Sequence, residues 1–296
     1  MNPCKVLPIL AMVILLGSCV VIWFYPPTGD YRVDNPSWNG FSELNKATNA
    51  ESLGSLTDLP SSGAGTALIV VPYSQYSQEE LSLISRYVAS GGTLILMDDY
   101  GSGNQVLGGL GLDARFSGQT LLDPLYNYKN KNFPTITDFA STSANVNVSS
   151  VILNHATHLT NVDGMTVIAY SSTFSFSDGN GDGTYDSDEI TGSLPVVAYT
   201  KSGQGYVVVV SDPSLAINGM INLDDNSAFM TQVLSIGGGN PQIYIDQSHL
   251  QSTALDQSKA VLATVYSMVA SPLGTLTLIV VVLAYSLNRF WKRGKQ

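Results

Sequence analysis

Residues 66–99, TALIVVPYSQYSQEELSLISRYVASGGTLILMDD, decide the expected fold. Residues 66–71 and 93–97 are continuous apolar runs, which is typical of strands buried on both faces of a parallel sheet. Between them, Ser77 precedes two glutamates and apolar residues at helical spacing, and Gly91 supplies a stop. Strand, helix and strand within about 35 residues predict a βαβ unit with a right-handed crossover and parallel strands.

The same pattern returns near the far end of the chain. Residues 194–200 and 205–211 predict two further strands, a loop and a helix follow them, and residues 242–246 predict a last strand. We therefore expect one α/β domain of the Rossmann-like or flavodoxin-like type, with three layers and a mainly parallel sheet. The segments expected to be neighbouring strands of that sheet are 67–72, 93–98 and 206–211.

Charge is distributed unevenly along the 296 residues, of which only 12% are charged. All 23 acidic residues lie between Asp30 and Lys259, together with eight of the 13 basic residues, so this stretch has a formal charge of −15. Two uncharged apolar segments, 6–25 and 261–287, flank it. A helix of about 20 residues spans the roughly 30 Å hydrocarbon core of a bilayer, so we expect a transmembrane helix on each side of an acidic domain.

The basic residues at the two ends predict the orientation in the membrane. Lys5 precedes the first apolar segment, and four bases follow the second one in the tail NRFWKRGKQ. Positive charge flanks the cytoplasmic side of membrane spans, which predicts two spans of the cell membrane with both termini in the cytoplasm. The expected parts are an N-terminal signal anchor (1–27), an extracytoplasmic α/β domain (28–258), and a C-terminal transmembrane helix with a basic tail (259–296).

Two alternatives remain for the first segment. A cleaved signal peptide has an apolar core of about 7 to 15 residues and a small-residue ending, whereas this run is longer and lacks an A-x-A site. Residues 16–19, Leu-Gly-Ser-Cys, resemble a lipobox that would make Cys19 a lipidation site, although the apolar run continues to Tyr25. The other cysteine is Cys4, so the expected outer domain has neither a disulfide nor a thiol nucleophile.

Residues 178–189, DGNGDGTYDSDE, match a twelve-position calcium loop. Oxygen-bearing side chains stand at positions 1, 3, 5, 9 and 12, a backbone carbonyl is available at position 7, and glycine at position 6 permits a sharp turn. The expected ligands of a structural Ca²⁺ are Asp178, Asn180, Asp182, Thr184, Asp186 and Glu189. An acidic surface turn would have the same composition. The flanking segments have the pattern of strands, so we expect an isolated loop without EF-hand helices.

Histidines and strand-end carboxylates are weaker candidates. His155 and His158 are three residues apart, as are Asp246 and His249, but zinc would need further ligands. Four aspartates lie at or after expected strand ends, where ligands bind in open α/β sheets and where helix caps also lie: Asp98, Asp99, Asp212 and Asp225. A hydrolase dyad of Ser211 with His249 lacks the G-x-S-x-G turn. Asn147 stands in a glycosylation sequon.

The segments 66–104, 205–229 and 243–249, in this order and followed by a C-terminal membrane helix, resemble the family called domain of unknown function 4350. The resemblance covers most of residues 28–295. That family resembles the class I glutamine amidotransferase-like fold, and its members often neighbour MoxR-type ATPases and transglutaminase-like membrane proteins. The resemblance implies a part in a cell-envelope assembly and no known activity. Glutaminase chemistry is excluded because it needs a cysteine nucleophile, which the expected outer domain lacks.

The expected function is therefore a non-catalytic, membrane-anchored binding or scaffolding domain in an envelope complex with membrane proteins or an ATPase. No catalytic residue is assigned. The alternatives are an extracytoplasmic hydrolase that uses the strand-end carboxylates, and an accessory subunit of an ABC-type exporter. The acidic charge makes nucleic acid a poor partner, because nucleic-acid binding depends on basic contacts to phosphates.

Overall fold

A computed structural model describes residues 3–140 and 148–293, which fall into two compact units. The sheet unit comprises Thr28–Gln251, and the helical unit comprises Met1–Pro27 with Ser252–Gln296. Residue Asn147 of the sequon lies outside the described residues.

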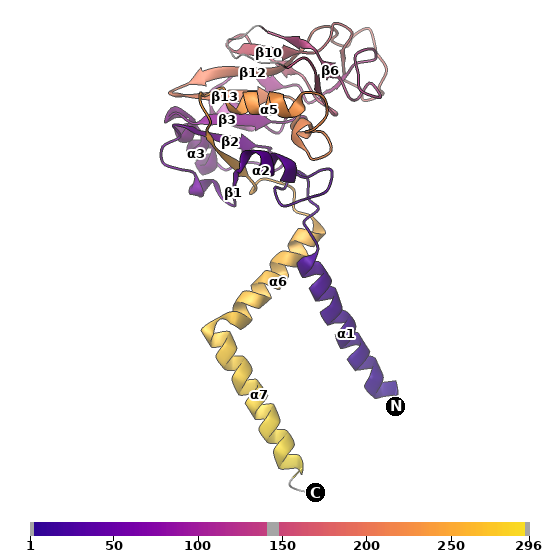
Figure 1. The fold of residues 1–296 in the computed structure, drawn as a ribbon, viewed down its shortest axis with the longest axis vertical. Coiled ribbons are helices and arrows are strands. Elements are labelled where there is room, and N and C mark those ends of the chain that lie inside the picture. Colours follow the sequence, from indigo (N-terminus) through magenta and orange to yellow (C-terminus); the bar gives the residue numbers. More distant parts are fainter. Residues whose placement is uncertain (1–2, 141–147, 294–296) are drawn as a thin grey trace. The chain divides into compact units, whose positions relative to one another are not determined.

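An eight-stranded mixed sheet forms the centre of the sheet unit (Figure 1). Its strand order is β1-β14-β2-β3-β13-β12-β10-β7. The strands from β1 to β13 in this order are parallel to one another, and the remaining three are antiparallel. Their bounds are β1 (Glu51–Leu53), β14 (Gln242–Asp246), β2 (Thr66–Val70), β3 (Thr93–Met97), β13 (Gly205–Val210), β12 (Pro195–Ser202), β10 (Thr166–Tyr170) and β7 (Asp138–Phe139).

The three strands expected to be neighbours are neighbours, so the prediction of a mainly parallel arrangement there is confirmed. Ile95 of β3 pairs with Ile69 of β2 on one side and with Val208 of β13 on the other. All five residues of β3 are buried, which explains why its sequence is a continuous apolar run without alternation.

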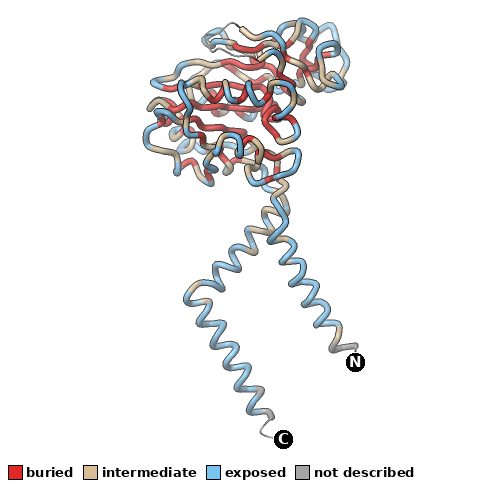
Figure 2. The backbone as a smooth tube through the Cα atoms, in the orientation of Figure 1, coloured by how far each residue is buried: buried red, intermediate tan, exposed pale blue. Residues whose placement is uncertain are grey.

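Helices cover both faces of this sheet. Successive strand residues point to opposite faces, and Leu94 and Leu96 belong to the same core cluster as Ile84 of α3 (Gln78–Ala89). Ile95 and Met97 belong to the other cluster, with Phe229 of α5 (Asn226–Leu234). The sheet unit therefore has helix, sheet and helix layers, with buried residues concentrated in the strands (Figure 2).

Short elements complete the sheet unit. The helices and 3₁₀ turns are α2 (Ser42–Thr48), η1 (Leu56–Asp58), α4 (Asn104–Gly109) and η2 (Pro213–Ala216). The short strands form three pairs: β4 (Arg115–Phe116) with β9 (Leu159–Thr160), β5 (Thr120–Leu122) with β11 (Phe176–Asp178), and β6 (Thr135–Ile136) with β8 (Val151–Ile152).

The helical unit contains α1 (Pro3–Phe24), α6 (Ala254–Ala270) and α7 (Pro272–Arg293). Within the described part of the chain, one helix is by itself long and apolar enough to cross a membrane: residues Val6–Phe24, with a mean hydropathy of 2.7 and no buried residues. A membrane span and an N-terminal signal sequence both have these properties.

The apolar run 261–287 is not one continuous helix, because the chain bends by 74° between α6 and α7. Pro272 begins α7, and a proline ring disfavours helical backbone in the preceding residue. Ser271 accordingly has an extended conformation, with φ −63° and ψ 152°. Residues Ala254–Ala270 and Pro272–Asn288 together make at most one broken span.

Candidate functional site

A pocket of about 280 Å³ lies at the edge of the sheet where β3 and β13 end. We call it the carboxyl-edge pocket. Four aromatic side chains and two carboxylates contribute to its wall: Tyr31, Trp38, Tyr73, Tyr100, Asp30 and Asp99. Asn154, His155 and Ser214 also line it. The carboxyl ends of parallel strands are the usual ligand-binding edge of an open α/β sheet.

Three of the four strand-end aspartates organise backbone. Asp98 accepts hydrogen bonds from the amides of Tyr100 at 3.0 Å and Gly103 at 2.7 Å, just before α4. The partners of Asp212 are the amides of Asn154 and Ser214, both at 2.7 Å. Asp225 accepts from the amides of Ser149 and Ser150. Asp212 thus caps η2, whereas Asp225 occupies the N-cap position of α5 but holds a neighbouring loop.

Asp99 is different from these three aspartates. Its side chain is 9% exposed and lines the pocket, and within the described residues its carboxylate has no hydrogen-bond partner on another residue. Burial, reinforced by the neighbouring charge of Asp98, raises the pKa of Asp99 to about 7. Burial also raises the pKa of Asp212 well above its ordinary value. A strongly shifted carboxyl group in a concave site is typical of functional sites.

Two tyrosines hold the inner wall of the pocket in place. Tyr31 is buried, its hydroxyl lies 3.2 Å from that of Ser214, and its ring contacts Phe41 edge to face at 5.2 Å between centroids. The ring of Tyr73 lies 5.8 Å from that of Tyr31. Burial and the charge of Asp30 raise the pKa of Tyr73 to about 12, so the phenol is neutral at physiological pH.

The histidines of the NHATHLT segment have different surroundings. His155 is exposed at the rim of the pocket. His158 is buried, its Nδ1 lies 2.9 Å from the Ser117 hydroxyl, and burial lowers its pKa to about 4. No group of three His, Cys, Asp or Glu side chains suited to a metal occurs among the described residues, so the structure offers no zinc site there.

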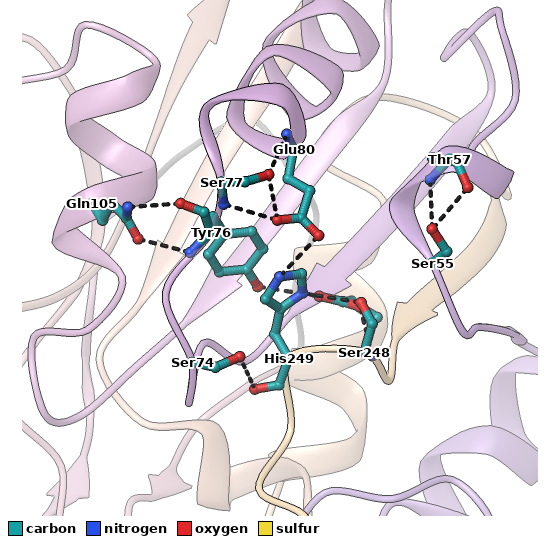
Figure 3. Close-up of polar contacts among 10 residues, drawn as sticks. Ser55, Thr57, Ser74, Tyr76, Ser77, Glu80, Gln105, Ser248 and His249 are labelled. Atoms are coloured by element: carbon teal, nitrogen blue, oxygen red, sulfur yellow. Dashed lines mark hydrogen bonds and ion pairs between the residues drawn. The ribbon is translucent and has the colours of Figure 1, made fainter.

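His249 belongs to a second polar cluster, shown in Figure 3. Its Nδ1 lies 2.7 Å from the Asp246 carboxylate, its Nε2 lies 3.4 Å from Glu80, and its ring stacks on Tyr76 with centroids 3.7 Å apart. Burial opposes the imidazolium charge, but Asp246 and Glu80 outweigh it and raise the pKa of His249. The dyad with Ser211 does not form, since the Ser211 hydroxyl is buried without a hydrogen-bond partner among the described residues.

The expected calcium loop leaves β11 and folds back on itself. Both oxygens of Asp178 accept backbone hydrogen bonds, from Gly181 at 2.8 Å and from Gly183 at 2.9 Å. Glu189 accepts from the amide of Gly179 at 2.8 Å and so closes the loop. Gly183 has φ +75°, the left-handed conformation that position 6 requires.

Other contacts of the loop lie among the expected ligands themselves. The Asn180 side-chain amide donates to Asp186 at 2.8 Å, and the amide of Thr184 donates to Asp182 at 2.7 Å. Lys131 donates to the Gly183 carbonyl from outside the loop. The segments on either side, β11 and β12, are strands, so the expectation of a loop without EF-hand helices is confirmed. Calcium itself stays a prediction.

Sequence reasoning singled out Asp99 but missed the pocket around it. Tyr31, Tyr73 and Asn154 come from three loops that are distant in sequence, and periodicity within a segment does not indicate which loops meet. The available signal was the Asp98-Asp99 pair at a strand end. The carboxylate of Asp98 accepts backbone hydrogen bonds there, whereas that of Asp99 does not.

Comparison with known proteins gives one family and several distant structures. A family model described as "Domain of unknown function (DUF4350)" matches residues 33–234. No curated protein matches the chain. Among solved structures, the mmIFT52 N-terminal domain is similar, with 12% identity and a TM-score of 0.53, over 67% of this chain and 91% of that one.

Two further structures are more distant. "Cytoplasmic Protein STM1381" from Salmonella typhimurium LT2 has 15% identity and a TM-score of 0.41, over 62% of this chain and 77% of that one. A ThuA-like protein from Bacteroides uniformis has 12% identity and a TM-score of 0.41, over 68% and 84%. At these identities the comparisons bear on the fold alone, and the amidotransferase-like fold implied by the family resemblance stays a prediction.

Proposed function

The chain belongs to the DUF4350 family, and we propose that it is a membrane-anchored binding protein whose carboxyl-edge pocket holds a ligand outside the cytoplasm. The sheet unit is the binding domain, of the Rossmann-like or flavodoxin-like three-layer type. Its ligand enters at the ends of β3 and β13, beside Asp99.

The observation that carries this proposal is the carboxylate of Asp99, which lines the pocket and accepts no hydrogen bond from another residue in the described part of the chain. Partial burial of a charged group costs free energy unless a partner offsets it. For Asp98 and Asp212 this cost is offset, because each carboxylate accepts two backbone hydrogen bonds. A ligand that pairs with Asp99 offsets this cost. Its affinity benefits because the carboxylate is already held in place before binding.

Membrane attachment supports a role in a cell-envelope assembly. In this proposal α1 is one span and α6 with α7 is a second, broken one, and the basic residues at both ends favour the cytoplasmic side. The loop 178–189 holds a structural Ca²⁺ that stiffens the sheet unit. Partners are membrane proteins or an ATPase of the same assembly, and co-purification of a transport ATPase would favour the exporter-subunit alternative.

A hydrolase is the second candidate function, favoured by the pKa of Asp99 near 7, which suits a general acid or base. Binding without turnover is preferred because the sheet unit has no cysteine and because the imidazole of His249 is engaged by Asp246 and Glu80. A nucleophile activated by an adjacent base is thus not available from these groups.

The test is a ligand screen on the full-length chain in detergent, read by thermal unfolding. The variant Asp99→Asn removes the charge in the pocket, and Asp113→Asn makes the same change at an exposed aspartate outside it. We expect ligands that raise the melting temperature of wild type and Asp113→Asn but not of Asp99→Asn. Ester, peptide and glycan substrates should not be turned over. Turnover that Asp99→Asn abolishes would replace this function with the hydrolase.

A further inference from the structure

We propose that the carboxyl-edge pocket binds an organic ammonium group, which pairs with Asp99 and lies against the tyrosine and tryptophan rings of the wall. This inference rests on the proposed binding function and names the chemical class of its ligand. The free carboxylate, the sign of the charge around it, the aromatic wall and the volume each bear on that class.

The charge of the pocket favours a cation. Asp30 and Asp99 line it, and neither lysine nor arginine is among its lining residues. Asp98 and Asp212 act electrostatically on Asp99 and Tyr31 from the surrounding structure. These carboxylates would repel an anionic ligand, which would find no lysine or arginine among the lining residues, whereas they attract a cation.

The aromatic residues favour an organic cation. The faces of Trp and Tyr rings attract ammonium groups, and this interaction strengthens when the group is desolvated. Trp38 and Tyr100 are 69% and 71% exposed, so their rings are available at the rim. Tyr31 and Tyr73 are held deeper by mutual ring contact. A ligand entering between the two pairs exchanges water for aromatic faces on its way to Asp99.

A metal ion fits this wall poorly. Hard cations require several oxygen ligands, and the carboxylates that line the pocket are those of Asp30 and Asp99. The pocket volume of about 280 Å³ lies just below the usual range of about 300–1,000 Å³ for small-molecule sites. This size suits the ammonium end of an aliphatic chain better than a bulky ligand.

Proton exchange should accompany binding. The titratable groups around Asp99 are Asp30, Tyr31, Tyr73, Asp98, Tyr100, His155 and Asp212. Burial and Asp98 raise the pKa of Asp99 to about 7, so a large fraction of this carboxyl group is protonated at neutral pH. A cation favours the ionised form. Since an alkylammonium keeps its own proton until about pH 10, its binding releases the proton of Asp99, and affinity rises with pH from 6 to 8.

The experiment is calorimetric titration of the full-length chain in detergent. The ammonium probes are 1,4-diaminobutane, tetramethylammonium and Nα-acetyl-lysine amide, and Nα-acetyl-norleucine amide and glucose are the neutral controls. We expect the ammonium probes to bind wild type and Asp113→Asn, and to bind Asp99→Asn roughly tenfold more weakly or worse, as for loss of a charged partner. Affinity for these probes should rise from pH 6 to pH 8 in wild type and in Asp113→Asn, but not in Asp99→Asn. Buffers of different ionisation enthalpy measure the released proton.

A second variant guards against misfolding of Asp99→Asn. Trp38 is exposed, so Trp38→Ala removes a ring of the wall without opening the core, and it should weaken the ammonium probes while preserving the melting temperature of the free protein. Tighter binding of diaminobutane than of the lysine amide identifies a free amine as the source of the ammonium group. The opposite order identifies a lysine side chain of a partner, and both orders support the ammonium class.

Other outcomes overturn the inference and separate it from the proposed function. If the neutral controls bind as tightly as the ammonium probes, and Asp99→Asn changes neither, the pocket binds ligands but not by charge. If Ca²⁺ binds in a way that Asp99→Asn abolishes, the occupant is a metal. If the wider screen finds an anionic or neutral ligand at the pocket, binding stands and the ammonium class fails. If no compound acts through the pocket, both fail.

Discussion

The imidazole Nδ1 of His249 lies 2.7 Å from the carboxylate of Asp246, three residues earlier at the end of β14. The other ring nitrogen faces Glu80 at 3.4 Å, in the first turn of α3. Glu80 also closes the capping box of that helix with Ser77. The carbonyl of His249 in turn accepts the amide of Tyr73 at 3.1 Å. This one residue therefore connects the exit of β14 with the loop between β2 and α3.

Replacement of His249 by glutamine should destabilise the sheet unit below neutral pH. The pKa of His249 is raised in the folded chain, so its ion pairs contribute fully below about pH 6.5 and are lost as pH rises through the folded pKa. We expect the free energy of unfolding to fall by about 1.5–3 kcal/mol at pH 6, the range for hydrogen bonds to charged groups, and by less at pH 9. Chemical denaturation of the full-length chain at both values measures it.

The control for this prediction is His155→Gln, which changes an exposed histidine. It should leave the difference between pH 6 and pH 9 as in wild type. Equal destabilisation by His249→Gln at both pH values would mean that the ring contributes by packing on Tyr76 alone.

Replacement of Asp99 by asparagine should stabilise the ligand-free chain at high pH. The pKa of Asp99 rises from an ordinary value of 3.8 to about 7 on folding, so the folded state holds a proton that the unfolded state loses. Its contribution to stability is present below pH 3.8 and is lost as pH rises through about 7. At pH 8 the variant should gain stability, with an upper limit of about 4 kcal/mol, since each pKa unit corresponds to about 1.36 kcal/mol.

The measurement is again chemical denaturation of the full-length chain, at pH 5 and pH 8. Asp113→Asn should leave the free energy of unfolding unchanged at both pH 5 and pH 8, because Asp113 is exposed. An Asp99→Asn chain that is less stable than wild type at pH 8 would show that the carboxylate has a stabilising partner. Stabilisation combined with loss of ligand binding is the pattern expected of a functional residue.

The central sheet was predictable because each of its main strands has a recognisable local sequence pattern. The continuous apolar runs of β2, β3 and β13 each specify a strand buried on both faces, and the well-capped α3 between two of them fixes the crossover. Short strands such as β7, with two residues, carry too few side chains to show any period. The break between α6 and α7 has a local signal in the sequence, Pro272, inside the uncharged run 261–287.

The sites were less predictable because they depend on contacts between distant segments. The spacing of Asp246 and His249 is visible in the sequence, but the approach of Glu80 is set by the pairing of β14 beside β2. Likewise, nothing local distinguishes Asp99 from Asp98. Only the folded chain shows that the amides of Tyr100 and Gly103 donate hydrogen bonds to the carboxylate of Asp98.

The proposed orientation in the membrane predicts different accessibility of two engineered cysteines. With Cys4 and Cys19 replaced by serine, a cysteine at Ser62 should react with a membrane-impermeant thiol reagent added to intact cells, and one at Lys295 should not. The reason is the basic residues at both ends, which favour the cytoplasmic side. Permeabilised cells provide the control, since both sites should then react. Equal reaction in intact cells would contradict two spans.

The calcium prediction rests on the repulsion among the five carboxylates of residues 178–189, which a divalent cation would relieve. Extracellular calcium modules have dissociation constants of about 10⁻⁴ to 10⁻³ M. A calcium concentration ten times the dissociation constant adds roughly 1.4 kcal/mol to the free energy of unfolding. The full-length chain should therefore melt several degrees higher in millimolar Ca²⁺ than in chelator, and much less so in Mg²⁺, which holds its waters. Asp178→Ala or Glu189→Ala should abolish the shift, whereas Asp113→Asn should keep it. Lys131→Met should enlarge it, because the Lys131 ammonium donates to the Gly183 carbonyl and repels an incoming cation. A full shift in the variant lacking both Asp178 and Glu189 would leave the loop as an acidic turn.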